Sequence, residues 1–122
     1  EDIRVTMVGD RVISAVVIES PEGTLDFRSD PSYREEGGTY REVELPAHVV
    51  EQCRRAMRAC KLEFSGIDLR RSGDDWVFIE LNFSPVYLEV EQKLGHPITA
   101  ALVNYVRERA MAHRYRRRRA HG

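Results

Sequence analysis

The sequence predicts an α+β fold, in which helices pack on one face of an antiparallel sheet. Strand-like runs occur as two pairs, each joined by a short turn, and an amphipathic helical stretch follows each pair. This order of elements argues for a single lobe of this class. The chain of 122 residues is long enough for one domain, and its 42% hydrophobic and 32% charged residues are typical of a folded globular protein.

The first pair of strands covers residues 2–8 and 11–19, where β-branched residues are frequent and Gly9-Asp10 supplies a tight turn. A second turn leads into a short strand at residues 24–28, and an irregular, glycine-containing loop comes next. A brief strand at residues 40–44 completes this half of the chain.

Two helices are predicted from apolar residues that recur three and four positions apart. The first begins near Pro46, and its apolar face comprises Val49, Val50, Cys53, Met57 and Cys60. Strand-like runs at residues 64–69 and 76–81 then flank a turn and should pair antiparallel. The second helix opens at Pro97, and its apolar face comprises Ile98, Ala101, Leu102, Tyr105 and Val106.

The two cysteines lie on the first predicted helix. Cys53 and Cys60 are seven residues apart, which on a helix is about two turns, or ~10 Å. A disulfide between them is therefore not expected, and no histidine lies at ligand spacing. We expect both to be ordinary buried thiols.

The charge is distributed unevenly along the chain. Residues 113–122 contain five arginines and no acid, whereas the preceding 112 residues carry 14 basic and 20 acidic side chains, net −6. We therefore expect a folded lobe at residues 1–112, whose acidic character suits divalent cations, and a basic, disordered tail at residues 113–122. No apolar run has the length of a membrane span and no secretion signal is visible, so a cytoplasmic setting is expected.

Three polar residues on the second pair of strands form the strongest candidate for a chemical site. Asp68 lies on one strand, and Glu80 and Asn82 lie two apart, hence on the same side, of the next. Two carboxylates and an amide oxygen are a ligand set that suits Mg²⁺. Spacing alone leaves another interpretation open, in which the acids pair with Arg70, Arg71 or another arginine, or point to solvent.

Three segments together resemble ATP-grasp ligases. Asp68 with Glu80-Leu81-Asn82-Phe83-Ser84-Pro85, followed by Glu91 and Gly95, resembles the magnesium-binding signature of that family. Asp2-Ile3-Arg4-Val5 with Val8-Gly9-Asp10 resembles the strand and turn that open its C-terminal half, and Phe27-Arg28-Ser29-Asp30 resembles its arginine-containing loop. The resemblance spans residues 2 to about 109 and implies an ATP-grasp C-terminal lobe.

The resemblance also implies roles for individual residues. Asp68, Glu80 and Asn82 would hold one or two Mg²⁺ ions, with Mn²⁺ as a substitute, and Glu80 and Asn82 would contact the bound ATP. Arg28 would stabilise a developing oxyanion, and Arg4 would contact phosphate or substrate. Without the resemblance, Arg28 is equally a solvated loop cation or a partner of a neighbouring acid, and Arg4 points either to a cleft or to solvent.

Within the family the chain looks nearest to ligases that act on peptides or proteins, namely ribosomal-protein glutamate ligases and the maturases of microviridin-type peptides. These form an acyl phosphate from ATP and a carboxylate, which an amine or hydroxyl then attacks. The chain departs from the glutamate-ligase pattern at Asp30 and Val86, where that family has asparagine and glycine. Asp30 places an acid where that family has a neutral amide, and Val86 alters the loop beside the metal.

The expected partners follow from the same resemblance. They are a peptide or protein substrate and the N-terminal and central domains of a longer parent protein, because the chain starts within a strand-like run and looks like a fragment. A homo-oligomer is compatible with the sequence, whereas a membrane is not expected. Two other classes stay open: a non-catalytic module of the same fold that binds a partner, and, less favoured, a nucleic-acid binder that uses the arginine tail.

Overall fold

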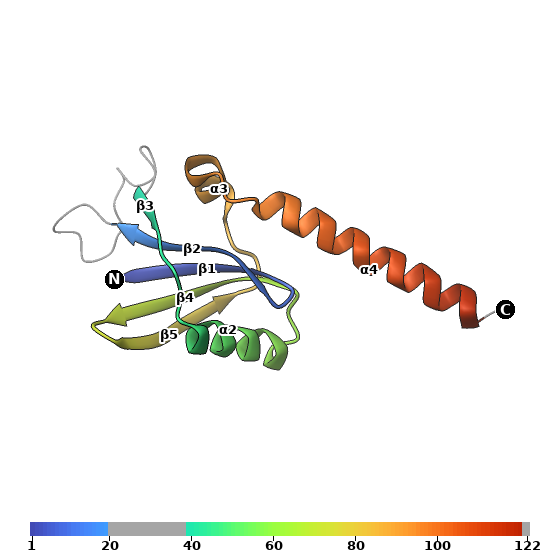
Figure 1. The fold of residues 1–122 in the computed structure, drawn as a ribbon, viewed down its shortest axis with the longest axis horizontal. Helices are drawn as coiled ribbons and strands as arrows, with labels where there is room; N and C mark the ends of the chain where they lie inside the picture. The colour runs from blue at the N-terminus through green and yellow to red at the C-terminus, as the bar shows by residue number, and fades with distance from the viewer. Residues whose placement is uncertain (20–38, 121–122) are drawn as a thin grey trace.

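The computed structural model describes residues 1–19 and 39–120, which form one sheet and three helices (Figure 1). The sheet has five strands in the order β3-β2-β1-β4-β5, and all neighbours are antiparallel. The strands are β1 (Asp2–Val8), β2 (Arg11–Glu19), β3 (Thr39–Glu42), β4 (Phe64–Ser72) and β5 (Asp75–Asn82). Both predicted strand pairs and the brief strand between them are confirmed, whereas the predicted strand at residues 24–28 lies outside the described residues.

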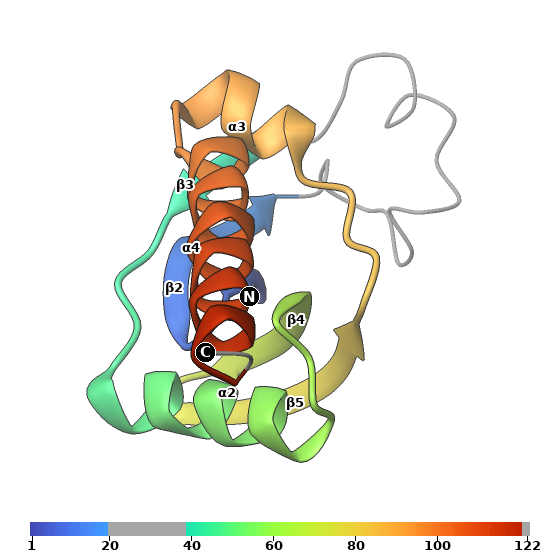
Figure 2. The ribbon, with the colours of Figure 1, turned by 90° about the vertical axis from the view of Figure 1, so that its right-hand side faces the viewer.

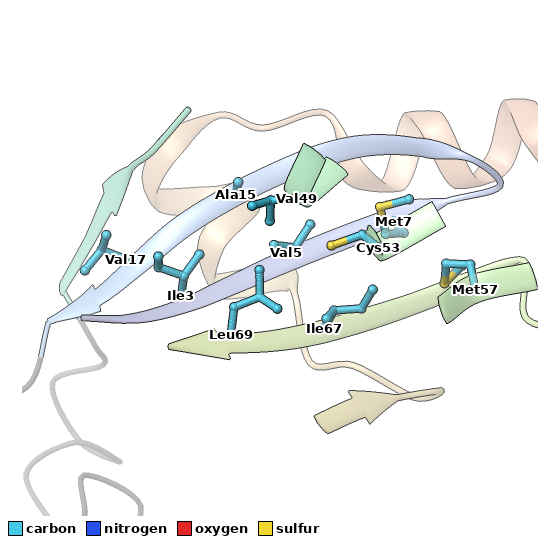
Figure 3. Close-up of a cluster of buried hydrophobic side chains, with 10 residues drawn as sticks. All are labelled: Ile3, Val5, Met7, Ala15, Val17, Val49, Cys53, Met57, Ile67 and Leu69. Carbon is cyan, nitrogen blue, oxygen red and sulfur yellow. The ribbon is translucent and has the colours of Figure 1, made fainter. Parts of the chain in front are cut away.

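Helix α2 (Ala47–Ala59) covers one face of the sheet and encloses the main core (Figure 3). Its buried residues Val49, Cys53 and Met57 meet the inward side chains of β1, β2 and β4. Each large side chain removed from water here contributes about 1.5–3 kcal/mol, so this layer is the main source of stability. Cys53 is buried as expected, but Cys60 is exposed, because it lies beyond the last turn of α2 as its C-cap.

The other two helices lie on the opposite face, so the prediction that all helices share one face is wrong (Figure 2). Helix α3 (Leu88–Leu94) and the start of α4 (Ile98–Ala120) form a second, smaller cluster. In it, Val90 of α3 and Ile98 of α4 pack against Val16 of β2. The physical reason is that β2 is buried on both faces, and such a strand needs cover on each side. The predicted α+β class with an antiparallel sheet is confirmed.

Helix α4 begins against the sheet and then extends past its end (Figure 1). Tyr105 of α4 rests on Gly9 in the β1–β2 turn, where a Cβ atom would lie only 2.8 Å from the Tyr105 ring. Beyond this contact the helix is exposed and continues to Ala120, through the residues expected to be disordered. Arginine and alanine, the main residues there, are strong helix formers. The domain boundary at residue 112 stays a prediction.

Candidate metal and nucleotide site

The face of the sheet opposite α2 carries the candidate functional side chains. Strand β1 sends Ile3, Val5 and Met7 toward α2, so Arg4 points to the other face. The strand register places one residue of each other strand in line with Arg4. Across the sheet, this central row consists of Glu42, Val16, Arg4, Asp68 and Glu80.

Arg4 and Asp68 form a bidentate ion pair at the middle of the central row. Arg4 Nε donates to Oδ1 of Asp68 at 2.8 Å, and Arg4 Nη2 donates to Oδ2 at 3.0 Å. The two side chains are only 22% and 16% exposed, so water screens this pair less than a surface pair. The structure thus pairs Arg4, which the resemblance assigns to phosphate or substrate, with Asp68, which it assigns to the metal.

The other arginines considered as partners of the acids are engaged elsewhere. Arg70 forms a bidentate pair with Asp2 at 2.7 and 3.2 Å, which raises the pKa of Arg70. Arg71 binds the carboxylate of Glu1, and this hydrogen bond lowers the pKa of Glu1. Asp68 is therefore compensated by an arginine, as the alternative interpretation proposed, but the arginine comes from β1.

A bulge in β5 sets the direction of Glu80. Asp68 is in register with Glu80 and Leu69 with Phe78, so Ile79 is an extra residue in β5. Phe78 and Leu81 both lie on the α2 side, which strict alternation would forbid for residues three apart. The bulge resolves this conflict and brings Glu80 to the face of Asp68. Glu80 is exposed, so its charge carries no cost of burial.

Asn82 is held by the loop that follows β5. Its Oδ1 accepts a hydrogen bond from the Ser84 N–H at 2.8 Å, and one lone pair of that oxygen is left to face another group. Pro85 lies against Gly66, the β4 residue in register with Asn82. A Cβ atom on Gly66 would lie 2.9 Å from the Cβ of Pro85. The sequence did not reveal this role of Gly66, although a glycine inside a strand is a signal of close backbone approach.

Glu91, which belongs to the resemblance, has a role in the fold. Its Oε1 accepts from the Thr99 N–H at 2.8 Å, and its Oε2 accepts from Thr99 Oγ1 at 2.5 Å. The side-chain hydrogen bond, followed by the backbone one, lowers the pKa of Glu91. Glu91 therefore caps the first turn of α4 and fixes this helix to α3.

His96 lies between α3 and α4 and fastens their junction to the sheet. Its Nδ1 lies 2.7 Å from Ser14 Oγ, and its Nε2 lies 3.6 Å from Oε1 of Glu42. The order Ser–His–Glu suggests a nucleophile, but Ser14 is only 3% exposed and leaves no room for a substrate. His96 therefore has a structural role at this junction.

The three candidate ligands offer donors that fit Mg²⁺. Asp68 and Glu80 stand directly opposite each other on neighbouring strands, and Asn82 is two residues further on the same face. Over residues 1–19 and 39–120, no group of three His, Cys, Asp or Glu side chains is placed to hold a metal. Two carboxylates and an amide still suit Mg²⁺, which completes its shell with phosphate oxygens and water. Arg28 lies outside the described residues.

Solved structures with a similar arrangement of elements include ATP-grasp ligases. A RiPP-associated ATP-grasp ligase from Chryseobacterium gregarium, in complex with ADP and a leader and core peptide, superposes with a TM-score of 0.71 at 20% identity, over 88% of this chain and 33% of that one. The ligase PsnB with a minimal precursor gives 0.65 at 27% identity, over 87% and 36%. D-alanine–D-alanine ligase from Bacillus anthracis gives 0.56 at 16%, over 96% and 41%. The fold is thus that of part of an ATP-grasp enzyme.

Sequence comparison identifies the family within this fold. Residues 1–106 match the RimK-like ATP-grasp domain, and the chain belongs to this family. Probable alpha-L-glutamate ligase 1 of Shewanella sp. (strain MR-4) is 30% identical over 116 residues, which are 95% of this chain and 37% of that protein. The corresponding ligase of Chromohalobacter salexigens is 30% identical over 109 residues, 89% of this chain and 34% of that protein. The chain spans just over a third of the length of these relatives.

Proposed function

We propose that the chain is the metal- and phosphate-binding lobe of an ATP-dependent ligase that joins a carboxylate to an amine or a hydroxyl group. The observation that carries this proposal is the register of Asp68 with Glu80, which sets two carboxylates opposite each other with Asn82 beside them. Membership of the RimK-like family supports it, because the relatives matched are named as ligases.

In this proposal the residues of the site divide the work of binding and orientation. Asp68, Glu80 and Asn82 would hold one or two Mg²⁺ or Mn²⁺ ions, with Glu80 and Asn82 beside the phosphates of ATP. A bound Mg²⁺ neutralises the charge of the phosphoryl group during its transfer. The hydrogen bond from Ser84 fixes the amide of Asn82 before ligands arrive, so its orientation costs little on binding.

The two arginines would act on negative charge in the reaction. Formation of an acyl phosphate from ATP and a carboxylate, followed by attack of the amine or hydroxyl, creates an oxyanion that needs a fixed donor. Arg28 is proposed as that donor. Arg4, on the same face as Asp68 and Glu80, is proposed to contact phosphate or substrate. Removal of such a donor commonly lowers kcat by about 100-fold or more.

The substrate is proposed to be a peptide or a protein. PsnB and the Chryseobacterium ligase were solved with precursor or leader and core peptides, and MdnC of Microcystis aeruginosa with its precursor peptide. Further N-terminal and central domains are proposed to complete the nucleotide site, because the relatives are longer than this chain. A cytoplasmic setting is retained as part of the proposal. No helix in the described part of the chain could span a membrane.

Binding of nucleotide and metal tests the proposal directly. The full-length protein should be titrated by calorimetry with a nonhydrolysable ATP analogue in the presence of Mg²⁺. The double substitution Glu80→Gln with Asn82→Ala should abolish binding, because it removes one charged and one neutral ligand. Asp74→Asn is the matched control, since Asp74 is an exposed acid in the turn of the same hairpin. Equal affinity of the double variant and the control would refute the assignment.

The activated carboxylate requires a second assay. Candidate acceptors, including glutamate-containing peptides, should be screened for acyl-phosphate formation by trapping with hydroxylamine. A full-length protein that binds ATP and Mg²⁺ but forms no acyl phosphate with any acceptor would instead support the non-catalytic module.

A further inference from the structure

Both oxygens of Asp68 are engaged by Arg4. The two hydrogen bonds at 2.8 and 3.0 Å align the guanidinium with the carboxylate in the geometry that binds most strongly. A cation placed on Asp68 would meet the positive charge of Arg4 within a few ångströms. Two like charges this close together repel each other, and the low exposure of the Arg4 and Asp68 side chains limits how far solvent screens that repulsion.

The Arg4–Asp68 pair differs from the neighbouring Arg70–Asp2 pair in how deeply it is buried. Both pairs join an arginine and an aspartate of β1 and β4 through two hydrogen bonds. The Arg70–Asp2 side chains are 61% and 38% exposed, compared with 22% and 16% for Arg4 and Asp68. Solvent therefore screens the Arg70–Asp2 pair strongly, whereas it screens the charge of Arg4 less.

We propose that Arg4 and a divalent cation compete for Asp68, so that Arg4 is a positioning residue that holds the carboxylate in place and must turn away before Asp68 can ligate the metal. The inference rests on the proposed function for the identity of the ligand. Because Arg4 must first leave Asp68, the competition weakens metal binding in the absence of nucleotide. The displaced guanidinium can then bind an anion on the same face, which links cation and anion binding at the site.

Binding of Mn²⁺ alone to the 122-residue chain tests the competition. Free Mn²⁺ is measured by electron paramagnetic resonance in wild type and in Arg4→Met, Arg70→Met and Asp68→Asn. Arg4→Met should bind Mn²⁺ about 10-fold or more tightly than wild type, because a nearby positive charge is removed. Arg70→Met is the matched control, and its affinity should stay within about 2-fold of wild type. A merely structural role of Arg4 predicts the opposite, a loss of affinity.

Thermal unfolding provides a second readout. Without metal, Arg4→Met should have a lower Tm than wild type, because Asp68 loses a bidentate partner. Mn²⁺ should raise the Tm of Arg4→Met more than that of wild type. If Arg4→Met does not fold, Arg4→Gln replaces it, since glutamine removes the charge but can still donate a hydrogen bond to Asp68. Arg4→Gln should then bind Mn²⁺ more tightly than wild type.

The outcomes separate this inference from the proposed function. If Asp68→Asn abolishes Mn²⁺ binding but neither Arg4 variant tightens it, the competition is refuted and the metal site stands. If Mn²⁺ binding survives Asp68→Asn in the Arg4→Met background, the metal is not held by Asp68, and both the assignment and the competition fail. Tighter binding in Arg4→Met that is lost with Asp68→Asn supports the competition.

Discussion

Gly66 supports the loop after β5, and its replacement by alanine should displace that loop. The added Cβ would lie 2.9 Å from the Cβ of Pro85, whereas carbon atoms pack favourably at about 3.5–4.0 Å. The loop therefore has to move by roughly 0.6–1 Å. Over-packing of this kind typically costs about 1–3 kcal/mol, and the rigid ring of Pro85 limits how far the chain can relax.

The consequence for the site follows from the connection between Pro85 and Asn82. Because Ser84 holds the amide of Asn82, a shift of Pro85 should disturb that hydrogen bond and weaken nucleotide binding as well as stability. Urea denaturation and calorimetry with the ATP analogue measure the two effects. The double variant Gly66→Ala with Pro85→Gly removes the facing Cβ and should recover part of the loss. Strictly additive costs in this double-mutant cycle would refute the steric argument.

Three further predictions concern the fold. Glu91→Gln should lower the Tm near pH 7. The pKa of Glu91 lies below its ordinary value of 4.5, so the stabilising contribution of its carboxylate is fully present above about pH 4.5. The difference in Tm between variant and wild type should therefore vanish as the pH falls through the lowered pKa. A Tm difference that persists at low pH would contradict this. Truncation after Ala112 should leave the Tm almost unchanged, because residues 113–120 are exposed, and a large loss on thermal unfolding would show that the end of α4 is docked. One thiol, Cys60, should react rapidly with a colorimetric thiol reagent, while Cys53, whose pKa is raised by burial, should react only on unfolding; two fast thiols would overturn this.

The strands and the three candidate ligands could be predicted because their signals are local. Each hairpin is encoded by its own apolar pattern and turn, and Glu80 and Asn82 share a face by spacing alone. The unbroken apolar run Val16-Val17-Ile18 is typical of a strand buried on both faces. Such a strand requires cover on both faces of the sheet, which argues against helices on one face alone.

The features that escaped prediction depend on register between distant segments. Arg4 and Asp68 are 64 positions apart and meet because β1 pairs with β4, which no local pattern specifies. The bulge at Ile79 breaks the alternation on which a strand prediction relies. The contact of Gly66 with Pro85 likewise requires the loop to fold back over β4.

The central position of β1 gives the site an order of assembly. The ligands Asp68, Glu80 and Asn82 all belong to one hairpin, and hairpins form in about 1–10 μs. Their counter-ion Arg4 arrives only when β1 closes a loop of some sixty residues, a slower event that carries a larger entropy cost. During folding, Asp68 and Glu80 should therefore come together before Arg4 is in place. A divalent cation present at that stage would meet the two carboxylates without the competing charge of Arg4.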